Sequence, residues 1–344
     1  MGNNQLKIVI ILGSSKWGGG EKHVYDIIEH LQKKIQFTLI TQTSPILKEK
    51  FSKLKTKHLE WNMNFKSITD LLEHKKQISY LNTQNFSGVH CHLNDASFML
   101  STYRPFITTK ILSTVHGFSS HLYYLFPHHL ISVSQAIHNY LLNFSKKKST
   151  IIYNGISKEN IINKQTKDLQ AYIFATIHPN KGQEFVTNTL KNQKQDSKIC
   201  FIGTGPKKYQ NQLKQAIKSS NNDNISWIPL IGDLKQYYKQ ASFIIIPSYK
   251  EALSYVALEA LNFGVPVLAS STGGLKEVFE HEKHGLFFKA GDSSSFLQML
   301  SLMEKNHLIY RGFLKKQPFL DEKKHFKVEE MCNKLYSNYI EYFS

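Results

Sequence analysis

The chain has 344 residues, 41% of them hydrophobic and 20% charged, which excludes a disordered, collagen-like or membrane-spanning protein and leaves a globular one, with two domains at roughly 150 residues per domain. Its three widely spaced cysteines exclude a disulfide framework, and because no secretory signal is recognisable at the N-terminus we expect a cytoplasmic location. The net charge of +17 attracts anionic partners, but only Arg104 and Arg311 carry the guanidinium group on which base reading relies, so we expect no nucleic acid partner.

Short β-branched runs alternate with segments of helical period in both halves, which is typical of parallel sheets built from βαβ units. We therefore expect an α/β fold of two Rossmann-like, doubly wound domains facing across a cleft. The polar stretch 157–169 is the expected linker, which gives domains at 1–165 and 166–325, and we expect the last helix, residues 326–344, to cross back to the first domain. The expected strands are Lys7–Leu12, Phe37–Thr41, Val89–His92, Ile111–Val115, Leu130–Val133 and Thr150–Ile152, then Ala171–Ala175, Ile199–Ile202, Ser226–Ile228, Phe243–Ile246, Val267–Ala269 and Leu286–Phe288.

In such sheets ligands bind beyond the carboxyl ends of the strands. The loop after the first strand ends in Gly18, Gly19 and Gly20 and leads into a helix. Glycines allow a ligand to approach the backbone closely, and a helix N-terminus favours an anion or a hydroxyl group. No Lys-Ser or Lys-Thr follows these glycines and no acidic residue ends the second strand, so neither a P-loop nor a dinucleotide site is indicated. An ordinary tight turn is the alternative.

His116 directly follows the expected strand Ile111–Val115, where an imidazole can bind a sugar hydroxyl or stabilise developing charge. A structural histidine is the alternative. His90 and His92 lie on one face of a strand and could share a metal ion, but no carboxylate partner is evident nearby, so we expect them to be structural and expect no metal site.

The densest signal follows the strand that ends at Pro247. A loop carries Glu251, and a helix expected from about Ser254 to Phe263 carries Glu259. The unpaired N–H groups at the start of that helix could bind a diphosphate, and Glu259 could chelate ribose hydroxyls. Two solvated glutamates on a surface helix are the alternative.

Two further loops suit the same ligand. Lys181 follows a strand and precedes a helix, which places an ammonium group where it could neutralise phosphate charge. Gly203 ends another strand and would allow a flat base to approach closely.

Seven residues separate Glu251 from Glu259, and Gly264, Val265 and Pro266 follow. Together with shorter motifs in the same order along nearly the whole chain, this spacing resembles the E-x7-E signature of the retaining GT-B glycosyltransferases of family 4. The shorter motifs are Gly19-Gly20-Glu21, Val115-His116-Gly117, Tyr153-Asn154-Gly155-Ile156, Pro179-x-Lys181-Gly182, Gly203-x-Gly205-Pro206 and Thr272-Gly273-Gly274-x-x-Glu277.

The resemblance implies a nucleotide-sugar donor, UDP- or GDP-linked, bound mainly by the C-terminal domain, with no cofactor and no metal ion. It implies catalytic roles for His116 and Glu251 at the transferred sugar and for Lys181 at the diphosphate, while Glu259 binds the ribose. The other donor-binding residues it implies are Gly19, Gly20, Gly203, Leu253, Ser254 and Tyr255, with Pro229 and Leu230 beside the base.

The chain departs from the family pattern at two places. Ala175-Thr176 stands where Gly-Arg is usual, so a second cation on the diphosphate is missing unless Lys207 or Lys208 replaces it. Ala252-Leu253-Ser254 stands where Gly-Phe-Gly is usual, which crowds the backbone near the donor's sugar.

We expect transfer of a hexose or N-acetylhexosamine to a cell-envelope glycan such as lipopolysaccharide, capsule or glycolipid. Residues 1–165 carry 20 basic and 9 acidic side chains against 23 and 17 in residues 166–344, which suits an anionic or lipid-linked acceptor, although a Lys- and Asn-rich genome would give the same excess. Peripheral contact with the inner face of an anionic membrane is expected at Lys48–Lys57 or Leu122–Phe126. Two rivals stay open: a nucleotide-sugar epimerase of the same fold and a basic nucleic-acid-binding protein.

Overall fold

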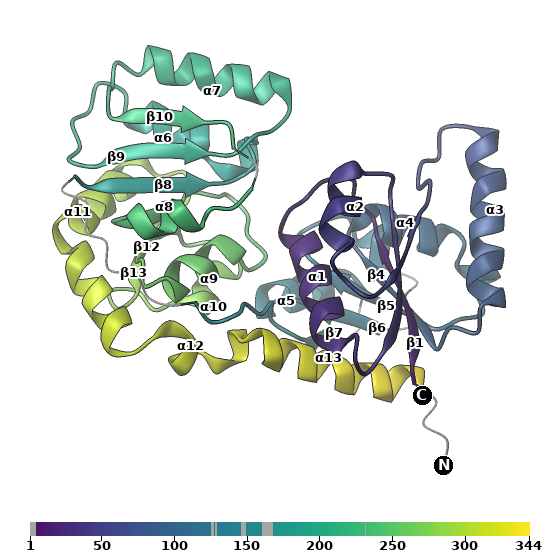
Figure 1. Cartoon of the computed structure of the whole chain (residues 1–344). Helices are drawn as coiled ribbons and strands as arrows, with labels where there is room; N and C mark the ends of the chain where they lie inside the picture. Colours follow the sequence, from purple (N-terminus) through teal and green to yellow (C-terminus); the bar gives the residue numbers. More distant parts are fainter. Residues whose placement is uncertain (1–4, 125–126, 128, 146–148, 160–167, 231) are drawn as a thin grey trace. The chain divides into compact units, whose positions relative to one another are not determined.

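The computed structural model describes residues 5–124, 127, 129–145, 149–159, 168–230 and 232–344. The chain divides into two compact units (Figure 1): unit 1 is Met1–Gly155 with His325–Ser344, and unit 2 is Ile156–Lys324. The boundary expected near residue 165 falls within 160–167, which lie outside the described residues.

In the part of unit 1 that is described, a seven-stranded sheet has the order β3-β2-β1-β4-β5-β6-β7, and every pairing is parallel. The strands are β1 (Lys7–Leu12), β2 (Gln36–Thr41), β3 (Lys57–Glu60), β4 (Gly88–His92), β5 (Ile111–Val115), β6 (His129–Ser132) and β7 (Ser149–Ile151). The helices are α1 (Gly19–Leu31), α2 (Pro45–Phe51), α3 (Ile68–Thr83), α4 (Asn94–Thr102), α5 (Gln135–Ser145) and α13 (Val328–Phe343), with short 3-10 turns at η1 (Arg104–Phe106) and η2 (His121–Tyr124).

The central strand β1 shows why its sequence is an unbroken apolar run. Ile8, Ile10 and Leu12 join a hydrophobic cluster with residues of α1 and α13, whereas Val9 and Ile11 join a second cluster with residues of α3 and α4. All five side chains are fully buried. Because successive residues of a strand point to opposite faces, a strand covered by helices on both sides is apolar throughout.

The last helix, α13, completes the core of unit 1. Four residues of its predicted packing face, Val328, Met331, Leu335 and Tyr339, are buried in the cluster that contains β1 and α1, and Tyr342 is partly buried. Figure 1 shows α13 beside α1, so segments from opposite ends of the chain pack together.

Strand β3 was not expected from the sequence. It has four residues, lies at the edge of the sheet and exposes Lys57 and Glu60, so it lacks the apolar run by which the other strands are recognised. The stretch Lys48–Lys57, expected to contact a membrane, contains the end of α2 and the first residue of β3. The other candidate stretch, Leu122–Phe126, includes residues 125 and 126, which lie outside the described residues.

In the described part of unit 2, a six-stranded sheet has the order β10-β9-β8-β11-β12-β13 and is also parallel throughout. Its strands are β8 (Gln170–Phe174), β9 (Lys198–Ile202), β10 (Ile225–Ile228), β11 (Phe243–Ile246), β12 (Val267–Ser270) and β13 (Gly285–Phe288). The helices are α6 (Gln183–Thr189), α7 (Lys207–Ser219), α8 (Lys235–Gln240), α9 (Tyr255–Asn262), α10 (Leu275–Val278), α11 (Ser293–Lys316) and α12 (Phe319–Glu322), with 3-10 turns η3 (Pro179–Lys181) and η4 (Lys324–Phe326), the last at the boundary with unit 1.

The prediction of an α/β fold with two doubly wound parallel sheets is confirmed. Each expected strand is present with ends within one residue of the expected ones. Within the described residues, no helix combines the length and apolar character that a bilayer-spanning segment requires.

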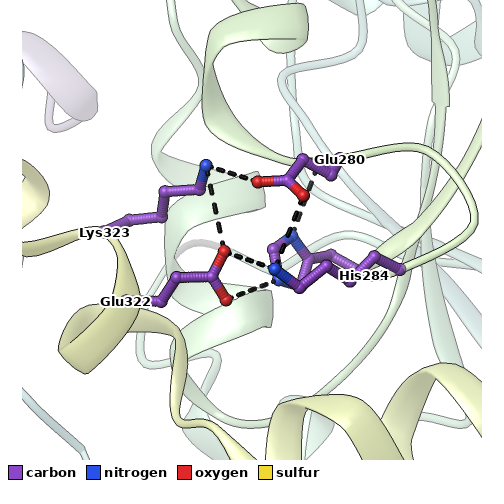
Figure 2. A network of polar contacts seen from close by, with 5 residues as sticks. Glu280, His284, Glu322 and Lys323 are labelled. Carbon is purple, nitrogen blue, oxygen red and sulfur yellow. Dashed lines mark hydrogen bonds and ion pairs between the residues drawn. The ribbon is translucent and has the colours of Figure 1, made fainter.

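A network of ion pairs fastens α12 to the turn before β13 (Figure 2). The Lys323 ammonium lies 2.7 Å from Glu280, and the Lys283 ammonium lies 2.6 Å from Glu322. The buried His284 ring lies 3.3 Å from Glu322. This network holds the segment by which the chain leaves unit 2.

Candidate active site

The strand order of unit 2 reverses between β8 and β11, and in doubly wound sheets ligands bind at this switch point. Two loops meet there, one after each strand. Gly182 has φ +71°, in the left-handed region, and a Cβ at this position would overlap the carbonyl oxygen of Pro247. The Tyr249 N–H donates to the Asn180 carbonyl at 2.9 Å. Glycine at position 182 therefore lets the loop after β8 lie directly against the loop after β11.

This approach places Lys181 against Glu251. The Lys181 ammonium lies 2.6 Å from Glu251 Oε1, which also accepts a hydrogen bond from the Ser248 hydroxyl at 2.8 Å. The Glu251 side chain is 13% exposed and the Lys181 side chain 32% exposed. The ammonium is thus fixed in position and still reachable by a ligand.

Helix α9 begins four residues after Glu251. Ser254 is its N-cap, and the Ser254 hydroxyl accepts a hydrogen bond from the Ala257 N–H at 3.3 Å. Ser254 has φ +96°, a conformation that favours glycine and is strained for other residues. Leu253 is buried and Tyr255 is half-buried. The first N–H groups of a helix have no partner within it, so this end of α9 suits an anion.

Glu259 lies on the second turn of α9 and is half-buried. Its Oε2 accepts a hydrogen bond from the Tyr238 hydroxyl at 2.9 Å. Burial, reinforced by the Glu259 charge, raises the pKa of Tyr238 well above its ordinary value, so this hydroxyl stays protonated and donates. The Glu259 carboxylate is therefore oriented by a group on the neighbouring helix α8.

The remaining predicted residues of unit 2 line neighbouring loops. Gly203 directly follows β9 with φ +150°, and a Cβ there would overlap the carbonyl oxygen of Ala175 in the loop after β8. Pro229 is exposed and Leu230 half-buried after β10, the edge strand next to β9. Because β10 is two strands from β8, Pro229 and Leu230 lie farther along the same edge of the sheet than Lys181.

Unit 1 carries the other predicted residues. Gly19 and Gly20 form the start of α1; Gly19 is exposed, and a Cβ at Gly20 would lie 2.9 Å from the Leu93 side chain. His116 follows β5 and is half-buried. Its Nε2 lies 3.0 Å from Nδ1 of His92, the last residue of β4. Burial lowers the pKa of His116 to about 4, so its imidazole is neutral at neutral pH.

Sequence reasoning missed several of these contacts. We expected His90 and His92 to be structural; His90 is bonded to Tyr339 at 2.6 Å and to Thr114 at 2.8 Å, but His92 lies against His116. The sequence held one signal for the contact between His92 and His116. His92 ends β4 and His116 directly follows β5, and these two parallel strands are neighbours in the sheet. Neither the Lys181–Glu251 pair nor the Tyr238–Glu259 hydrogen bond was expected, because those partners lie far apart in sequence and only the sheet order brings them together.

The groups assembled in unit 2 can bind both an anion and hydroxyl groups. A reachable ammonium group, a helix N-terminus and two oriented carboxylates lie along the carboxyl edge of one sheet. The first two favour an anion such as a diphosphate, and the carboxylates suit hydroxyl groups. A molecule that contains both kinds of group matches this edge.

Two models of known glycosyltransferase families match this chain. The family model for glycosyl transferases group 1 matches residues 156–316, and the model for glycosyltransferase family 4 matches residues 17–160. The two models together span residues 17–316, which is most of the chain.

Three relatives are distant in sequence but match this chain over most of their length. An O-antigen biosynthesis glycosyltransferase, WclY of Escherichia coli, is 22% identical over 336 residues, covering 88% of this chain and 90% of that protein. HepE of Anabaena, solved with UDP and glucose, has a TM-score of 0.83 at 17% identity, covering 97% of this chain and 99% of that one. The lipopolysaccharide outer core galactosyltransferase WaaB has a TM-score of 0.71 at 16% identity, with the same coverage. The chain belongs to the family 4, group 1 glycosyltransferases of the GT-B fold.

Proposed function

We propose that the chain transfers a hexose or N-acetylhexosamine from a UDP- or GDP-sugar to a cell-envelope glycan, with retention at the reacting carbon and without a metal ion. The observation that carries the proposal is the Lys181–Glu251 ion pair at the switch point of unit 2, beside the N-terminus of α9. A similar fold, that of HepE, was solved with UDP and glucose, which supports a nucleotide-sugar donor.

Lys181 acts on the leaving group in this proposal. Cleavage of the bond between sugar and phosphate leaves negative charge on the nucleoside diphosphate, and groups that bind this charge more strongly as it develops lower the barrier. The Lys181 ammonium and the N–H groups at the start of α9 are such groups. Because Glu251, itself held by the Ser248 hydroxyl, fixes the position of the ammonium before the donor arrives, little reorganisation is needed.

The rest of the donor extends along the sheet edge. We assign the transferred sugar to Glu251 and the ribose to Glu259, whose carboxylate Tyr238 orients. We assign the base to Pro229 and Leu230, with Gly203 between these residues and the diphosphate. β10 is two strands from β8, about 10 Å at the usual strand spacing, which suits the distance between the diphosphate and the base of a nucleotide.

Unit 1 supplies the acceptor side. We assign His116 to the reacting end of the donor sugar, as a neutral imidazole that accepts or donates a hydrogen bond, and Gly19 and Gly20 to close backbone approach near the donor. The proposed acceptor class is supported by WclY and WaaB, whose names place those proteins in O-antigen and lipopolysaccharide synthesis.

We place the protein in the cytoplasm, at the inner face of the membrane where lipid-linked acceptors lie. Helix α3 of unit 1 supports this location, because Ile68 and Leu72 on it are 78% and 59% exposed and the exposed Lys75 and Lys76 lie nearby in sequence. Apolar side chains beside lysines suit an anionic bilayer surface. In co-sedimentation with vesicles, Ile68→Asp/Leu72→Asp would reduce binding to phosphatidylglycerol vesicles; unchanged binding would exclude α3 as the contact.

A donor screen tests the central proposal. A nucleotide sugar at about 100 times its Kd stabilises the folded protein by about 2.7 kcal/mol, which raises Tm by several degrees. We expect this for UDP- or GDP-sugars and not for free hexoses. The stabilising donor is then incubated with a cell-envelope glycan acceptor, and transfer is measured. Epimerised free sugar formed without acceptor would replace the proposal by the epimerase alternative.

Metal independence has its own test. Because an ammonium group and helix N–H groups are assigned to the diphosphate, excess EDTA is expected to leave the transfer rate undiminished. Loss of transfer in EDTA, restored by a divalent cation, would contradict this part of the proposal.

A further inference from the structure

Three imidazoles converge in unit 1. His23, His92 and His116 each offer a ring nitrogen, and these atoms all lie within 4.8 Å of one another. The His92 and His116 nitrogens are 3.0 Å apart, and the His23 ring centre lies 4.9 Å from that of His116. Within the described residues, this is the one group of three or more histidine, cysteine or acidic side chains found with such spacing. We call it the histidine cluster.

The topology brings these residues together. The strand order of unit 1 reverses between β1 and β4, so the switch point of this sheet lies between them. His23 lies on α1, the helix that follows β1; His92 is the last residue of β4; His116 directly follows β5. Leu93, next to His92, has φ +67°, a strained conformation for a bulky residue, of the kind that collects at functional sites.

The two ring nitrogens of His92 have different surroundings, because Nδ1 lies at hydrogen-bond distance, 3.0 Å, from Nε2 of His116. His92 is fully buried, and its Nε2 has no hydrogen-bond partner among the described residues. An unsatisfied buried nitrogen is costly unless something binds it. Burial also lowers the pKa of His23 and of His92 well below the ordinary value, so both rings are neutral at neutral pH and can act as ligands.

Spacing and chemistry indicate a metal ion. Zinc bonds to histidine nitrogens at about 2.1 Å, so two ligands in tetrahedral geometry lie about 3.4 Å apart. The 3.0 Å between His92 Nδ1 and His116 Nε2 is close to this value, and His23, whose ligand nitrogen lies within 4.8 Å of the others, needs to approach by up to about 1.4 Å. Three imidazoles without a carboxylate favour Zn²⁺ or Co²⁺ over Mg²⁺ or Ca²⁺.

One ring of the cluster has a hydrogen-bond partner of the kind that supports metal ligands from outside. The Asn154 side chain hydrogen-bonds to His23. His90, whose ring centre lies 4.0 Å from that of His92, is fixed on both nitrogens by Tyr339 and Thr114. His116 is half-buried, so the cluster has one side open to solvent, by which an ion and a water ligand could enter.

We propose that His23, His92 and His116 bind one Zn²⁺ ion, and that the ion inhibits sugar transfer by occupying His116. The binding site stands on the cluster alone, whereas the inhibition rests on the proposed function, in which His116 contacts the donor sugar. The ion takes no part in the transfer itself, so removing it does not lower the rate.

The test uses the full untagged chain, freed of metal with EDTA and titrated with Zn²⁺ by calorimetry and with Co²⁺ by visible spectroscopy. We expect one equivalent to bind, and Co²⁺ to give the intense bands of a tetrahedral site. His116→Asn, at the half-buried position, and His23→Asn should each weaken Zn²⁺ binding at least about 100-fold. His30→Asn, on the same helix α1 but bonded only to the Asp26 carbonyl, is the matched control and should bind as wild type does.

Each outcome decides one part. No stoichiometric binding by wild type, or full binding retained in folded His116→Asn, overturns the site. One equivalent bound with an unchanged transfer rate retains the site and overturns the inhibition. A protein that binds Zn²⁺ but transfers no sugar in any condition retains the site and contradicts the proposed function instead.

Discussion

The two units share one sheet topology but place different chemistry at the same point of it. In both, the first six strands follow the order 3-2-1-4-5-6, so the switch point lies between the first and fourth strands of each unit. In unit 2 the loops there carry an ammonium paired with a carboxylate, Lys181 with Glu251. In unit 1 the same region carries three imidazoles, His23, His92 and His116, which burial keeps neutral by lowering their pKa values.

Topology decides where a ligand binds, and the side chains decide which ligand it is. A fixed cation beside a helix N-terminus suits a diphosphate, whereas uncharged rings suit hydroxyl groups or a soft metal ion. We therefore propose that the donor binds in unit 2 and the acceptor in unit 1.

The largest expected effect comes from removing the cation of unit 2. Lys181→Ala should lower kcat about 100-fold or more, because the ammonium acts mainly on charge that develops in the transition state. The Kd for the donor should rise by no more than about tenfold. Steady-state kinetics with calorimetric donor binding measures both quantities. Lys198→Ala, which removes an exposed lysine paired with Asp168 in the same unit, should change neither. Equal losses in kcat and in affinity would contradict a transition-state role.

Glu259→Ala should instead weaken the binding of the donor in its ground state. Loss of a carboxylate that binds ribose hydroxyls is expected to raise the donor Kd about 10- to 100-fold, the usual worth of hydrogen bonds to a charged group. Calorimetry measures the change. Tyr238→Phe removes only the hydroxyl that orients Glu259, and its effect should be smaller than about threefold. An unchanged donor Kd in Glu259→Ala would contradict the assignment of the ribose to Glu259.

The two units also differ in the backbone strain at a helix N-cap. Ser254 caps α9 at φ +96°, whereas Ser44 caps α2 of unit 1 at an ordinary φ of −160°. Ser254→Gly should relieve strain that exceeds the cap bond it loses and stabilise the protein by about 1 kcal/mol. Ser44→Gly should destabilise it. Chemical denaturation gives both values, and a lower stability of Ser254→Gly than of wild type would show that the serine is not strained.

The smallest effect concerns the network at α12. The Lys323 ammonium beside Glu280 holds the pKa of that carboxyl below its ordinary value of 4.5. The ionised carboxylate therefore contributes stability above about pH 4.5, and this contribution is lost as the pH falls through the lowered pKa. Because Glu280 is half exposed, Glu280→Gln should cost less than about 1 kcal/mol at pH 7 and flatten the fall of Tm in acid. Lys289→Gln, at an exposed lysine outside the network, is the control. An acid profile of Glu280→Gln identical to that of wild type would show that the pair contributes nothing.

The sequence was sufficient for the elements and their order, because buried parallel strands such as Lys7–Leu12 are continuous apolar runs. It did not reveal β3, since an exposed edge strand with Lys57 and Glu60 lacks that run. It located Lys181, Glu251 and Glu259 at strand ends or on the following helix. The sequence did not reveal Tyr238 as the partner of Glu259, nor did it reveal the histidine cluster. Both depend on strands that are neighbours in the sheet but distant in the chain.

The central claim is that unit 2 binds the donor around Lys181, Glu251 and α9. Hydrogen–deuterium exchange of the full chain, with and without the nucleotide sugar that raises Tm most, tests it directly. The account predicts slower exchange of the amides in residues 179–182 and 249–259 when the donor is present. Slower exchange confined to unit 1, or none in either segment, would contradict it.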